Sequence, residues 1–447
     1  MNTRSAELPQ VHFDALRVRR IVERVFRGYT GSLGVRLWDG KVISLGRASP
    51  VATVVVHAAT LLRELAWRPD VLRLAEAYFY EEIDVEGDLY ALLKQKIHLQ
   101  SVTMSMRDRL LLFSVALFAG SDSARVQRDN ASVRWTTPLQ ASTSRKHSKA
   151  HNREAIGFHY DASNEFYRLW LDEQMVYSCA YFNDPGESLE QAQRNKLDHI
   201  CRKLRLKAGE RLLDIGCGWG ALICWAAQQY GVRAHGITLS RQQYEYTQTK
   251  IRDLGLEQEV TVELRDYRDL SSDADFDKVS SIGMFEHVGL KNLPAYFRAV
   301  DRVLKPGGLF LNHGITDNET GRHNTVGTEF IHRYVFPDGE LDSVSNVQRE
   351  MERTGFEIAD VEALRPHYAL TLRHWVSRLE ARQKEALGLV SEAKYRVWRL
   401  YMAGCAVQFE NGAIGVYQIL AAKRGEGLVD LPLTRQDIYQ RNRKSTI

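Results

Sequence analysis

The chain has no apolar run long enough to cross a membrane. A transmembrane helix needs about 18 or more consecutive apolar residues, and the best candidate, residues 110–119, has ten. Its length favours a buried helix. Because Arg107 and Arg109 lie beside it, a helix that contacts a membrane surface remains an alternative interpretation. The first ten residues are polar and lack the apolar core of a signal peptide. We therefore expect a cytoplasmic protein without a membrane span.

Cysteines are few, and no strong charge of either sign is present. The five cysteines form no Cys-x-x-Cys pair and no cluster with histidine at metal-ligand spacing. An odd number without a secretion signal fits a reducing cytoplasm, and we expect no metal site. The net charge of +4 is too small to indicate nucleic acid binding but is compatible with docking on an anionic membrane.

Internal repeats and low-complexity tracts are also absent. The 447 residues, 44% hydrophobic and 26% charged, are typical of a soluble globular protein with two or three domains. We expect an N-terminal α+β domain at 1–120, a polar linker at 121–151 and a catalytic domain at 152–447. The N-terminal domain has no catalytic constellation, so a substrate- or membrane-docking role and a plain scaffold role stay open. The basic end of the linker, with Arg145, Lys146, Lys149 and Arg153, leaves open a contact with lipid phosphates, although such charge runs are usually only solvated.

The expected elements of the N-terminal domain follow from local patterns. Apolar residues at helical spacing predict a helix at 13–26. The dipeptide Asp39-Gly40 between two apolar runs predicts a β-hairpin at 34–45 with a two-residue type I′ turn. The remaining predicted elements are a strand at 51–56 and helices at 60–65, 70–80 and 88–95.

The most informative stretch is residues 212–220, Leu-Leu-Asp-Ile-Gly-Cys-Gly-Trp-Gly. It predicts a strand, a glycine turn and a helix at 221–230, with helix N–H groups facing a ligand. Gly216, Gly218 and Ala221 fit a loose dinucleotide fingerprint. However, Asp214 would repel a pyrophosphate, and the next strand ends in Thr238-Leu239-Ser240 without the carboxylate that a dinucleotide ribose needs. The cationic S-adenosylmethionine (SAM) is the better match.

Strands alternate with helices through the catalytic domain, which predicts an α/β, doubly wound, Rossmann-like parallel sheet. The expected strands are at 233–237, 260–265, 276–282 and 309–315, and the expected helices at 188–204, 241–254 and 293–303. Ligands bind at the carboxyl ends of the strands in such a sheet. The glycine turn, Thr238, Asp266-Tyr267, Glu286 and His313 all fall at or just beyond those ends.

Six motifs in order give the chain a family resemblance over residues 145–425. They are Tyr-Ser-Cys-Ala-Tyr-Phe, Leu-Asp-Ile-Gly-Cys-Gly-Trp-Gly, Gly-Ile-Thr-Leu-Ser, Met-Phe-Glu-His-Val-Gly, His-Gly-Ile and His-Tyr-Ala-Leu-Thr-Leu. The chain resembles bacterial cyclopropane-fatty-acyl-phospholipid synthases and their mycolic acid relatives, which are class I SAM-dependent methyltransferases. Residues 11–120 resemble, more weakly, the extra N-terminal domain of the phospholipid-acting members.

The resemblance implies a reaction and its residues. In that family SAM donates a methyl group to a cis double bond, and a bound bicarbonate takes the proton whose loss closes a cyclopropane ring. The positions that match the bicarbonate site are Cys179 and Ile315 (through their backbone), Glu286, His313 and Tyr368. The positions that match the SAM site are Tyr177, Ser178, Asp214, Gly216, Cys217, Gly218, Trp219, Gly220, Thr238, Leu239, Gln243, Tyr267 and Arg268. The family often has an aromatic–polar pair such as Trp-Glu where this chain has Tyr267-Arg268.

Other interpretations stay open from the sequence. Each polar residue alone fits a structural role, such as a buried small hydrophobe for Cys179 or a satisfied core histidine for His313. The related alternative alkylates the same double bond to a methylene- or methyl-branched acyl chain. A dinucleotide-dependent oxidoreductase and a non-catalytic lipid-binding protein are more distant alternatives. The leading hypothesis implies unsaturated membrane phospholipids as substrate, peripheral contact with the inner face of the cytoplasmic membrane, a homodimer and no nucleic acid partner.

Overall fold

The computed structural model describes residues 7–57, 61, 71–96, 98, 105–108, 110, 163–271, 275–318, 326–336, 339–425 and 431–439. The chain forms two compact units. One comprises Met1–Thr137, Thr325–Phe330 and Val390–Val407, and the other comprises Pro138–Asn324, Ile331–Leu389 and Gln408–Ile447. The expected linker at 121–151 and residues 111–119 of the expected apolar helix lie outside the described residues. The domain limits stay a prediction, and two segments expected in the catalytic domain group with the N-terminal unit.

The first unit is built on a four-stranded sheet. Its strands are β1 (Ser32–Arg36), β2 (Val42–Gly46), β3 (Ala52–Val56) and β4 (Ile83–Gly87), in the spatial order β2-β1-β3-β4. β1 pairs antiparallel with β2 and parallel with β3, while β3 pairs antiparallel with β4. Its helices are α1 (Glu7–Val25), α3 (Val71–Phe79), α4 (Leu89–Lys94) and most of α16 (Glu392–Glu410), and α12 (Val326–Tyr334) is divided between the units. Of the expected helix at 60–65, only residue 61 is described.

The predicted hairpin between β1 and β2 is confirmed, but its predicted turn type is wrong. Gly40 N donates to Leu37 O at 2.9 Å, and Leu37 pairs with Lys41, so the loop holds three residues. A two-residue type I′ turn needs positive φ at both central residues, and Asp39 lacks it while Gly40 has a φ of 77°. The sequence analysis did not predict β4. This strand is short, and its alternating apolar and acidic residues lie in a highly acidic stretch that obscures the pattern of a strand.

The second unit is the predicted doubly wound α/β domain. Its strands are β5 (Arg211–Ile215), β6 (Arg233–Thr238), β7 (Val260–Leu264), β8 (Phe276–Ile282), β9 (Leu304–Asp317), β10 (Phe356–Ala363) and β11 (Ile414–Lys423). They form one sheet in the order β10-β11-β9-β8-β5-β6-β7. β5 to β9 run parallel, and β11 runs antiparallel to both neighbours. This mostly parallel sheet confirms the fold class expected from the sequence.

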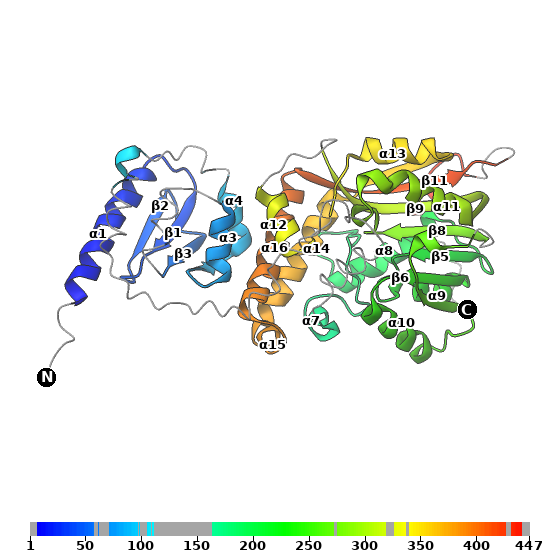
Figure 1. The fold of residues 1–447 in the computed structure, drawn as a ribbon, viewed down its shortest axis with the longest axis horizontal. Coiled ribbons are helices and arrows are strands. Elements are labelled where there is room, and N and C mark those ends of the chain that lie inside the picture. Colours follow the sequence, from blue (N-terminus) through cyan, green and yellow to red (C-terminus); the bar gives the residue numbers. More distant parts are fainter. Residues whose placement is uncertain are drawn as a thin grey trace. The chain divides into compact units, whose positions relative to one another are not determined.

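Helices cover both faces of this sheet, as Figure 1 shows for α11 and α13 on one side and α9 and α10 on the other. The helices of the second unit are α7 (Asn164–Arg168), α8 (Leu189–Lys203), α9 (Ala221–Tyr230), α10 (Arg241–Asp253), α11 (Leu293–Val303), α13 (Val344–Arg353), α14 (Arg365–Ala381), α15 (Gln383–Leu387) and α17 (Gln436–Tyr439). Short 3-10 helices are η3 (Tyr267–Asp269), η4 (Phe285–His287) and η5 (Leu290–Asn292). No helix in these described parts of the chain is both long and apolar enough to cross a bilayer.

Strand residues alternate between two apolar cores, one on each face of the sheet. Leu212 and Leu309 belong to the core beneath α8 and α9. Leu213 and Phe310, the next residue of each strand, belong to the core beneath α11 and α13. With both faces packed in this way, the carboxyl ends of the parallel strands are the edge where polar groups can meet a ligand.

Serine residues fix where several helices begin. Ser188 accepts from Gln191 N before α8, Ser240 from Gln243 N before α10 and Ser343 from Asn346 N before α13. Such N-caps satisfy N–H groups that have no partner within the helix. The caps of α8 and α10 set the register of the two helices that carry Lys196 and Gln243 toward the carboxyl edge.

Candidate active site

The glycine turn predicted from the sequence joins β5 to α9 and lines a cavity. Gly216, Gly218 and Gly220 all have positive φ, at 82°, 54° and 77°, where a side chain would be strained. Both Gly216 N and Cys217 N donate to Ile237 O of β6, at 2.9 and 3.0 Å, and these bonds fix the turn on the neighbouring strand. The turn therefore holds an open backbone loop at the carboxyl edge of the sheet.

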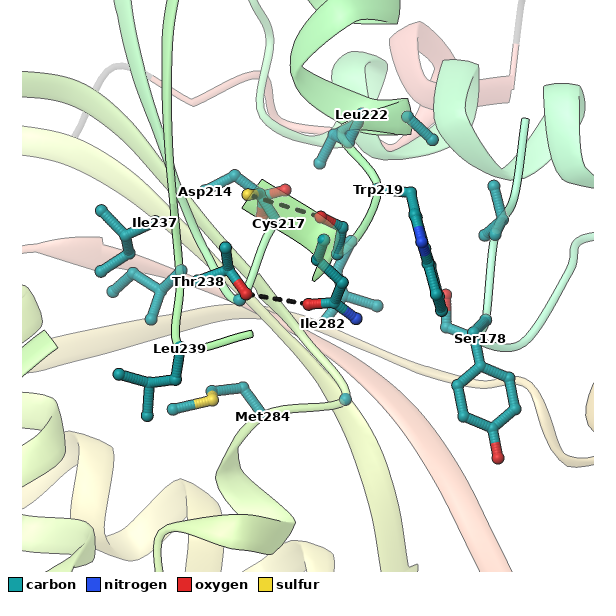
Figure 2. A pocket seen from close by; sticks show the side chains of 18 of the residues that line it. Ser178, Asp214, Cys217, Trp219, Leu222, Ile237, Thr238, Leu239, Ile282 and Met284 are labelled. Carbon is teal, nitrogen blue, oxygen red and sulfur yellow. Dashed lines mark hydrogen bonds between the residues drawn. The ribbon is translucent and has the colours of Figure 1, made fainter. Parts of the chain in front are cut away.

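The cavity runs along this loop and between the ends of β5, β6 and β8. Figure 2 shows Trp219 and Ser178 on one side of it and Ile237, Thr238 and Leu239 on the other. The predicted residues that line the cavity are Tyr177, Ser178, Asp214, Gly216, Cys217, Gly218, Trp219, Thr238, Leu239, Gln243 and Tyr267. The fold therefore brings together residues that lie up to 90 positions apart in the sequence, from Tyr177 to Tyr267.

Two predicted residues lie elsewhere. Gly220 caps α9, and a Cβ there would meet the side chain of Thr247, so its position reflects helix packing. The Arg268 guanidinium bonds both oxygens of Asp266, at 2.8 and 2.6 Å, and lies over the ring of Tyr267. Arg265, which was not predicted, lines the cavity.

Two buried groups of opposite charge face the cavity. Asp214 is 3% exposed and accepts a hydrogen bond from Ser280 Oγ at 2.7 Å. Burial raises its pKa to about 6, against the opposing effects of Ser280 and Lys196. Lys196 on α8 is 2% exposed and donates from Nζ to Ser178 Oγ at 3.0 Å, and burial lowers its pKa to about 8. At neutral pH the cavity therefore presents one carboxylate and one ammonium group.

Thr238 and Gln243 form a buried polar pair on the β6 side. Thr238 Oγ1 donates to Gln243 Oε1 at 2.8 Å, the dashed line at Thr238 in Figure 2. The same Oγ1 accepts from Ser240 N at 3.2 Å. Because Oε1 of Gln243 is engaged, its Nε2 group is the part that can donate to a ligand. The pair gives the cavity an oriented amide donor.

A second polar cluster lies beside the cavity, around Glu286 on η4. Its Oε1 accepts from Ile315 N of β9 at 2.7 Å, while Oε2 is buried and makes no hydrogen bond to any described residue. Burial raises the pKa of Glu286 to about 7, so both protonation states are accessible near neutrality. Ile315 thus gives its N–H to Glu286 and positions that carboxylate.

His313 lies two residues before Ile315 on β9, on the same face of the strand. Its Nδ1 faces Gln418 Nε2 of β11 at 3.3 Å, and the two residues are paired in the strand register. Burial, followed by the charges of Lys196 and Lys203, lowers the pKa of His313 well below its usual value, so the ring is neutral. Since an amide nitrogen can only donate, the proton of the neutral ring lies on Nε2.

Cys179 and Tyr368 both contact the backbone carbonyl of Leu364, a residue that is hydrogen-bonded to β11. Leu364 N donates to Val416 O of β11, and Val416 pairs with Ile315. The Cys179 thiol donates to Ala180 O at 3.3 Å and lies 3.8 Å from Leu364 O, while Tyr368 N donates to Leu364 O at 3.1 Å. Burial raises the pKa of the Cys179 thiol, which keeps it protonated and unsuited to act as a nucleophile. Glu286 and Ile315 are thus joined by a hydrogen bond and His313 lies two residues from Ile315, while Cys179 and Tyr368 both contact Leu364.

The aromatic residues Tyr181 and Phe182, which follow Cys179 in the first motif, stack on imidazoles. Tyr181 lies between His199 and His367, with ring centroids 4.3 and 4.8 Å away. Phe182 stacks on His367 and His374 at 6.5 and 5.6 Å. Both rings therefore make packing contacts with histidine side chains.

Comparisons with known proteins extend these observations. A family model described as "Mycolic acid cyclopropane synthetase" matches residues 147–419, and a model of a domain of unknown function matches residues 21–107. A probable fatty acid methyltransferase of Pseudomonas putida is 43% identical over 411 residues, covering 91% of this chain and 96% of the relative. The cyclopropane-fatty-acyl-phospholipid synthase of Escherichia coli K12 is 40% identical over 265 residues, 59% of this chain and 66% of the relative. The solved structure of mycolic acid cyclopropane synthase CmaA1, complexed with SAH (S-adenosylhomocysteine) and CTAB, aligns with a TM-score of 0.57 at 35% identity, covering 61% of this chain and 98% of that one.

Proposed function

Because the chain belongs to the mycolic acid cyclopropane synthetase family, we propose that it adds a methylene group from SAM to the cis double bond of unsaturated acyl chains in membrane phospholipids. Membership confirms the predicted family and makes the chain a SAM-dependent methyltransferase, so the oxidoreductase alternative is discarded. The observation that carries the proposal is the buried, partly unsatisfied Glu286 carboxylate beside a glycine-loop cavity.

The cavity residues fit SAM group by group. When bound, SAM supplies an electrophilic methyl group on a cationic sulfur. Gln243 can donate from Nε2 to a ribose hydroxyl, in place of the carboxylate that dinucleotide sites use. The buried ring of Tyr267 offers an apolar face for the adenine. The buried charge of Asp214 favours a cationic ligand over a pyrophosphate.

The cluster at Glu286 fits a bound bicarbonate, which when present supplies a base. A buried oxygen without a partner is costly and calls for a polar ligand. Glu286 Oε2 is such an atom, and the His313 Nε2–H is oriented as a donor by Gln418. We assign Glu286 and His313 to hold the anion, with Tyr368 and the backbone at Cys179 around it.

The remaining task of the chain is to protect a reactive substrate. Ring formation joins the donated methyl carbon to both alkene carbons, through a carbocation that then loses a proton. Water would trap that cation, so the site must exclude it while holding the alkene close to the methyl donor. Burial of Glu286 and His313, 5% and 2% exposed, is consistent with such a dry site.

A second candidate product is a methylene- or methyl-branched acyl chain. The relative that aligns over 91% of this chain bears the name probable fatty acid methyltransferase, which specifies no ring. Both candidates share the methyl transfer step and differ in how the carbocation is resolved. Glu286 and His313 favour ring closure because they form a site for a base.

The test is to incubate the purified protein with SAM and vesicles of cis-monounsaturated phospholipid, with and without bicarbonate. The expected product gains one CH₂ by mass spectrometry, loses its olefinic protons by NMR and forms faster with bicarbonate. The same gain with an exomethylene olefin would establish the branched product instead. SAM binding without any gain would favour the lipid-binding alternative and contradict catalysis.

The phospholipid substrate leads us to place the protein at the inner face of the cytoplasmic membrane, as a peripheral homodimer. Docking on the membrane surface would bring the acyl chains of bilayer lipids to the site, and two copies would add avidity. We assign the docking role to the N-terminal unit, whose sequence holds no catalytic constellation. Vesicle co-sedimentation and light scattering test the two claims separately, and a monomer that does not bind vesicles would contradict both.

A further inference from the structure

The short helix η4, which carries Glu286, lies between two glycines with a left-handed backbone. Gly283 before it and Gly289 after it have φ of 65° and 84°. Hinges in proteins are often a few residues at the ends of such elements. Gly289 also has no side chain to cap η5, so the first N–H groups of that helix need a partner from elsewhere. The contacts that hold η4 in place therefore decide where the carboxylate of Glu286 points.

Glu340, which lies 50 residues after Leu290, contacts both ends of this segment. Its backbone N donates to Glu286 O at 2.9 Å. Its carboxylate Oε2 accepts from Leu290 N at 2.9 Å, and it thereby caps η5 where Gly289 has no side chain to do so. A single residue thus holds η4 with its main chain and η5 with its side chain.

The stretch of chain that contains Glu340 is also bonded to β9. Asp342 O accepts from Asp317 N, at the last residue of β9, at 3.0 Å. Asp342 is fully buried, and its Oδ1 accepts from Ser343 N at 2.8 Å, directly before α13. Residues 340–342 therefore connect η4 to β9.

Together these contacts form a closed loop of hydrogen bonds around Glu286. Its Oε1 accepts from Ile315 N of β9, and its main-chain O accepts from Glu340 N. The loop returns to β9 through the bond between Asp342 and Asp317. The main chain of Glu286 and its Oε1 are thus both held relative to the same strand. Their positions set the direction of Oε2, the buried oxygen that makes no hydrogen bond to a described residue.

We propose that Glu340 is a positioning residue for the anion site, and that its carboxylate holds η4 so that Glu286 Oε2 faces the bound anion. Glu340 does not line the cofactor cavity, so its removal should affect the anion and leave the cofactor bound as before. The inference rests on the proposed function, because it takes the cluster around Glu286 as the bicarbonate site. It adds a residue that determines how tightly that anion is held.

The test measures bicarbonate binding apart from activity. Isotope-labelled bicarbonate would be titrated into protein saturated with S-adenosylhomocysteine and followed by NMR. We expect Glu340→Ala to bind bicarbonate about 10-fold more weakly, because it loses the hydrogen bond to Leu290 N and with it the fixed orientation of Glu286. Glu340→Gln should bind within about 3-fold of the wild type, since its amide oxygen can still accept from Leu290 N. In turnover, Glu340→Ala should need about 10-fold more bicarbonate to reach half of its maximal rate.

A second variant removes the same hydrogen bond from its donor side. Leu290 is the first residue of η5, a position where proline is tolerated, so Leu290→Pro deletes the N–H that Glu340 accepts. It should show the same selective loss of bicarbonate and tests the proposal even if Glu340→Ala does not fold. Affinity for S-adenosylhomocysteine, measured by calorimetry, should stay within about 2-fold in all three variants.

Glu210→Ala is the matched control. Glu210 Oε2 also accepts a main-chain N–H, from Lys207 N at 2.8 Å, but Glu210 directly precedes β5, at the opposite edge of the sheet from the site. This variant should bind both ligands as the wild type does. Unchanged bicarbonate binding in Glu340→Ala would overturn the proposal, and so would an equal loss of both ligands, which a general structural role would cause. A Glu340→Gln protein as weak as Glu340→Ala would also overturn it, whereas a wild type that binds no bicarbonate would contradict the anion site of the proposed function.

Discussion

Glu286 has two properties that suit the proposed site. Its Oε2 makes no hydrogen bond within the described residues, and burial raises the pKa of its carboxyl group to about 7. Oε1 is fixed by Ile315 N, so the carboxyl group has one orientation. Oε2 makes no hydrogen bond within the described residues and can bind either an O–H group or an anion, depending on protonation. The residue is therefore suited to hold and orient a small protonated anion.

Glu286→Gln should remove this function while preserving the cofactor cavity. The amide keeps the shape but cannot exchange a proton, so we expect turnover to fall about 100-fold or more. Affinity for SAM should stay within about 2-fold because Glu286 does not line that cavity. Turnover with labelled SAM and calorimetry check the two effects. A collapse of SAM binding would show that Glu286 belongs to the cofactor site.

The same substitution should change how stability depends on pH. The folded pKa of Glu286, about 7, is above its ordinary value of 4.5, so the folded state binds the proton more tightly. This contribution to stability is present below about pH 4.5 and is lost as pH rises through 7. Without ligands, Glu286→Gln should therefore match the wild type at pH 4.5 and be more stable at pH 8, by up to about 3 kcal/mol. Urea unfolding at both pH values measures the difference.

Glu362→Gln provides the control of opposite sign. Burial alone would raise the pKa of Glu362, but hydrogen bonding and charge from His199 and Lys203 lower it to about 2. Its contribution is present above the ordinary value of 4.5 and is lost as pH falls through 2. Glu362→Gln should hence be less stable than the wild type at pH 8. Equal pH profiles for the two variants would contradict the assigned protonation states.

The sequence identified most site residues but missed those whose role depends on tertiary contacts. Glycines, Asp214 and Glu286 carry motif signals because their backbone or charge is needed locally. Lys196 and Gln418 lie within an ordinary helix and an ordinary strand. Their only signal is a polar residue at a position where the apolar pattern predicts burial. The unpaired state of Glu286 Oε2 and the bond that orients His313 have no sequence signal at all.

At the level of elements, η4, the segment that follows β8, packs directly against β9 at Gly314. Gly314 lies between His313 and Ile315, and a Cβ there would overlap the ring of Phe285 and meet Glu286 Oε1. The missing side chain lets η4 rest on β9, and the bond from Ile315 N to Glu286 depends on that approach. Gly314 is thus a requirement of packing.

Gly314→Ala should push η4 away from β9. We expect a loss of stability of about 1–3 kcal/mol from overpacking and a larger fractional loss of turnover than of SAM affinity. Gly404→Ala is the matched control, because a Cβ at Gly404 in α16 meets nothing within 4 Å. That change should be neutral or stabilising by up to about 1 kcal/mol. Thermal unfolding and activity of both variants test the argument, and a fully active Gly314→Ala protein would refute it.

Elements with local signals were predicted well. The bounds of α9, α11 and β8 match the sequence expectation, and α8 begins and ends within one residue of it. Those segments carry helical periodicity, a serine cap or a buried run that needs no distant partner. The sequence did not predict β10 and β11 as separate strands. These two strands form an antiparallel pair at the edge of a parallel sheet, and such a pair is determined by contacts between residues far apart in the chain.

At the scale of the whole molecule, the N-terminal unit includes sequence from far along the chain. Arg396 of α16 is 8% exposed and lies over the Tyr78 ring, 5.0 Å from its centroid. It donates to Tyr78 O at 3.2 Å and to Asp84 of β4 at 3.3 Å. These contacts join residues more than 300 positions apart within one unit.

Arg396→Met should therefore loosen the edge of the N-terminal sheet. It keeps much of the side chain's bulk but removes the hydrogen bonds that Arg396 donates to Asp84 and to Tyr78 O, at a cost of about 1–3 kcal/mol. Hydrogen exchange should become faster at β4 and stay unchanged at β5. Arg382→Met removes an exposed pair with Glu385 and should leave both strands unchanged. Unaltered exchange at β4 in Arg396→Met would show that α16 does not support the sheet.

The same arrangement has a consequence for synthesis. The sheet of the N-terminal unit is complete at Gly87, but its last segment begins at Val390. At about 5–20 residues per second, a ribosome needs on the order of 15–60 s to make the intervening chain. During that time the sheet lacks the segment from Val390 onward, although it emerges before most of the second unit. This unit therefore cannot finish folding until the segment is made, and a chain truncated before residue 390 leaves it incomplete.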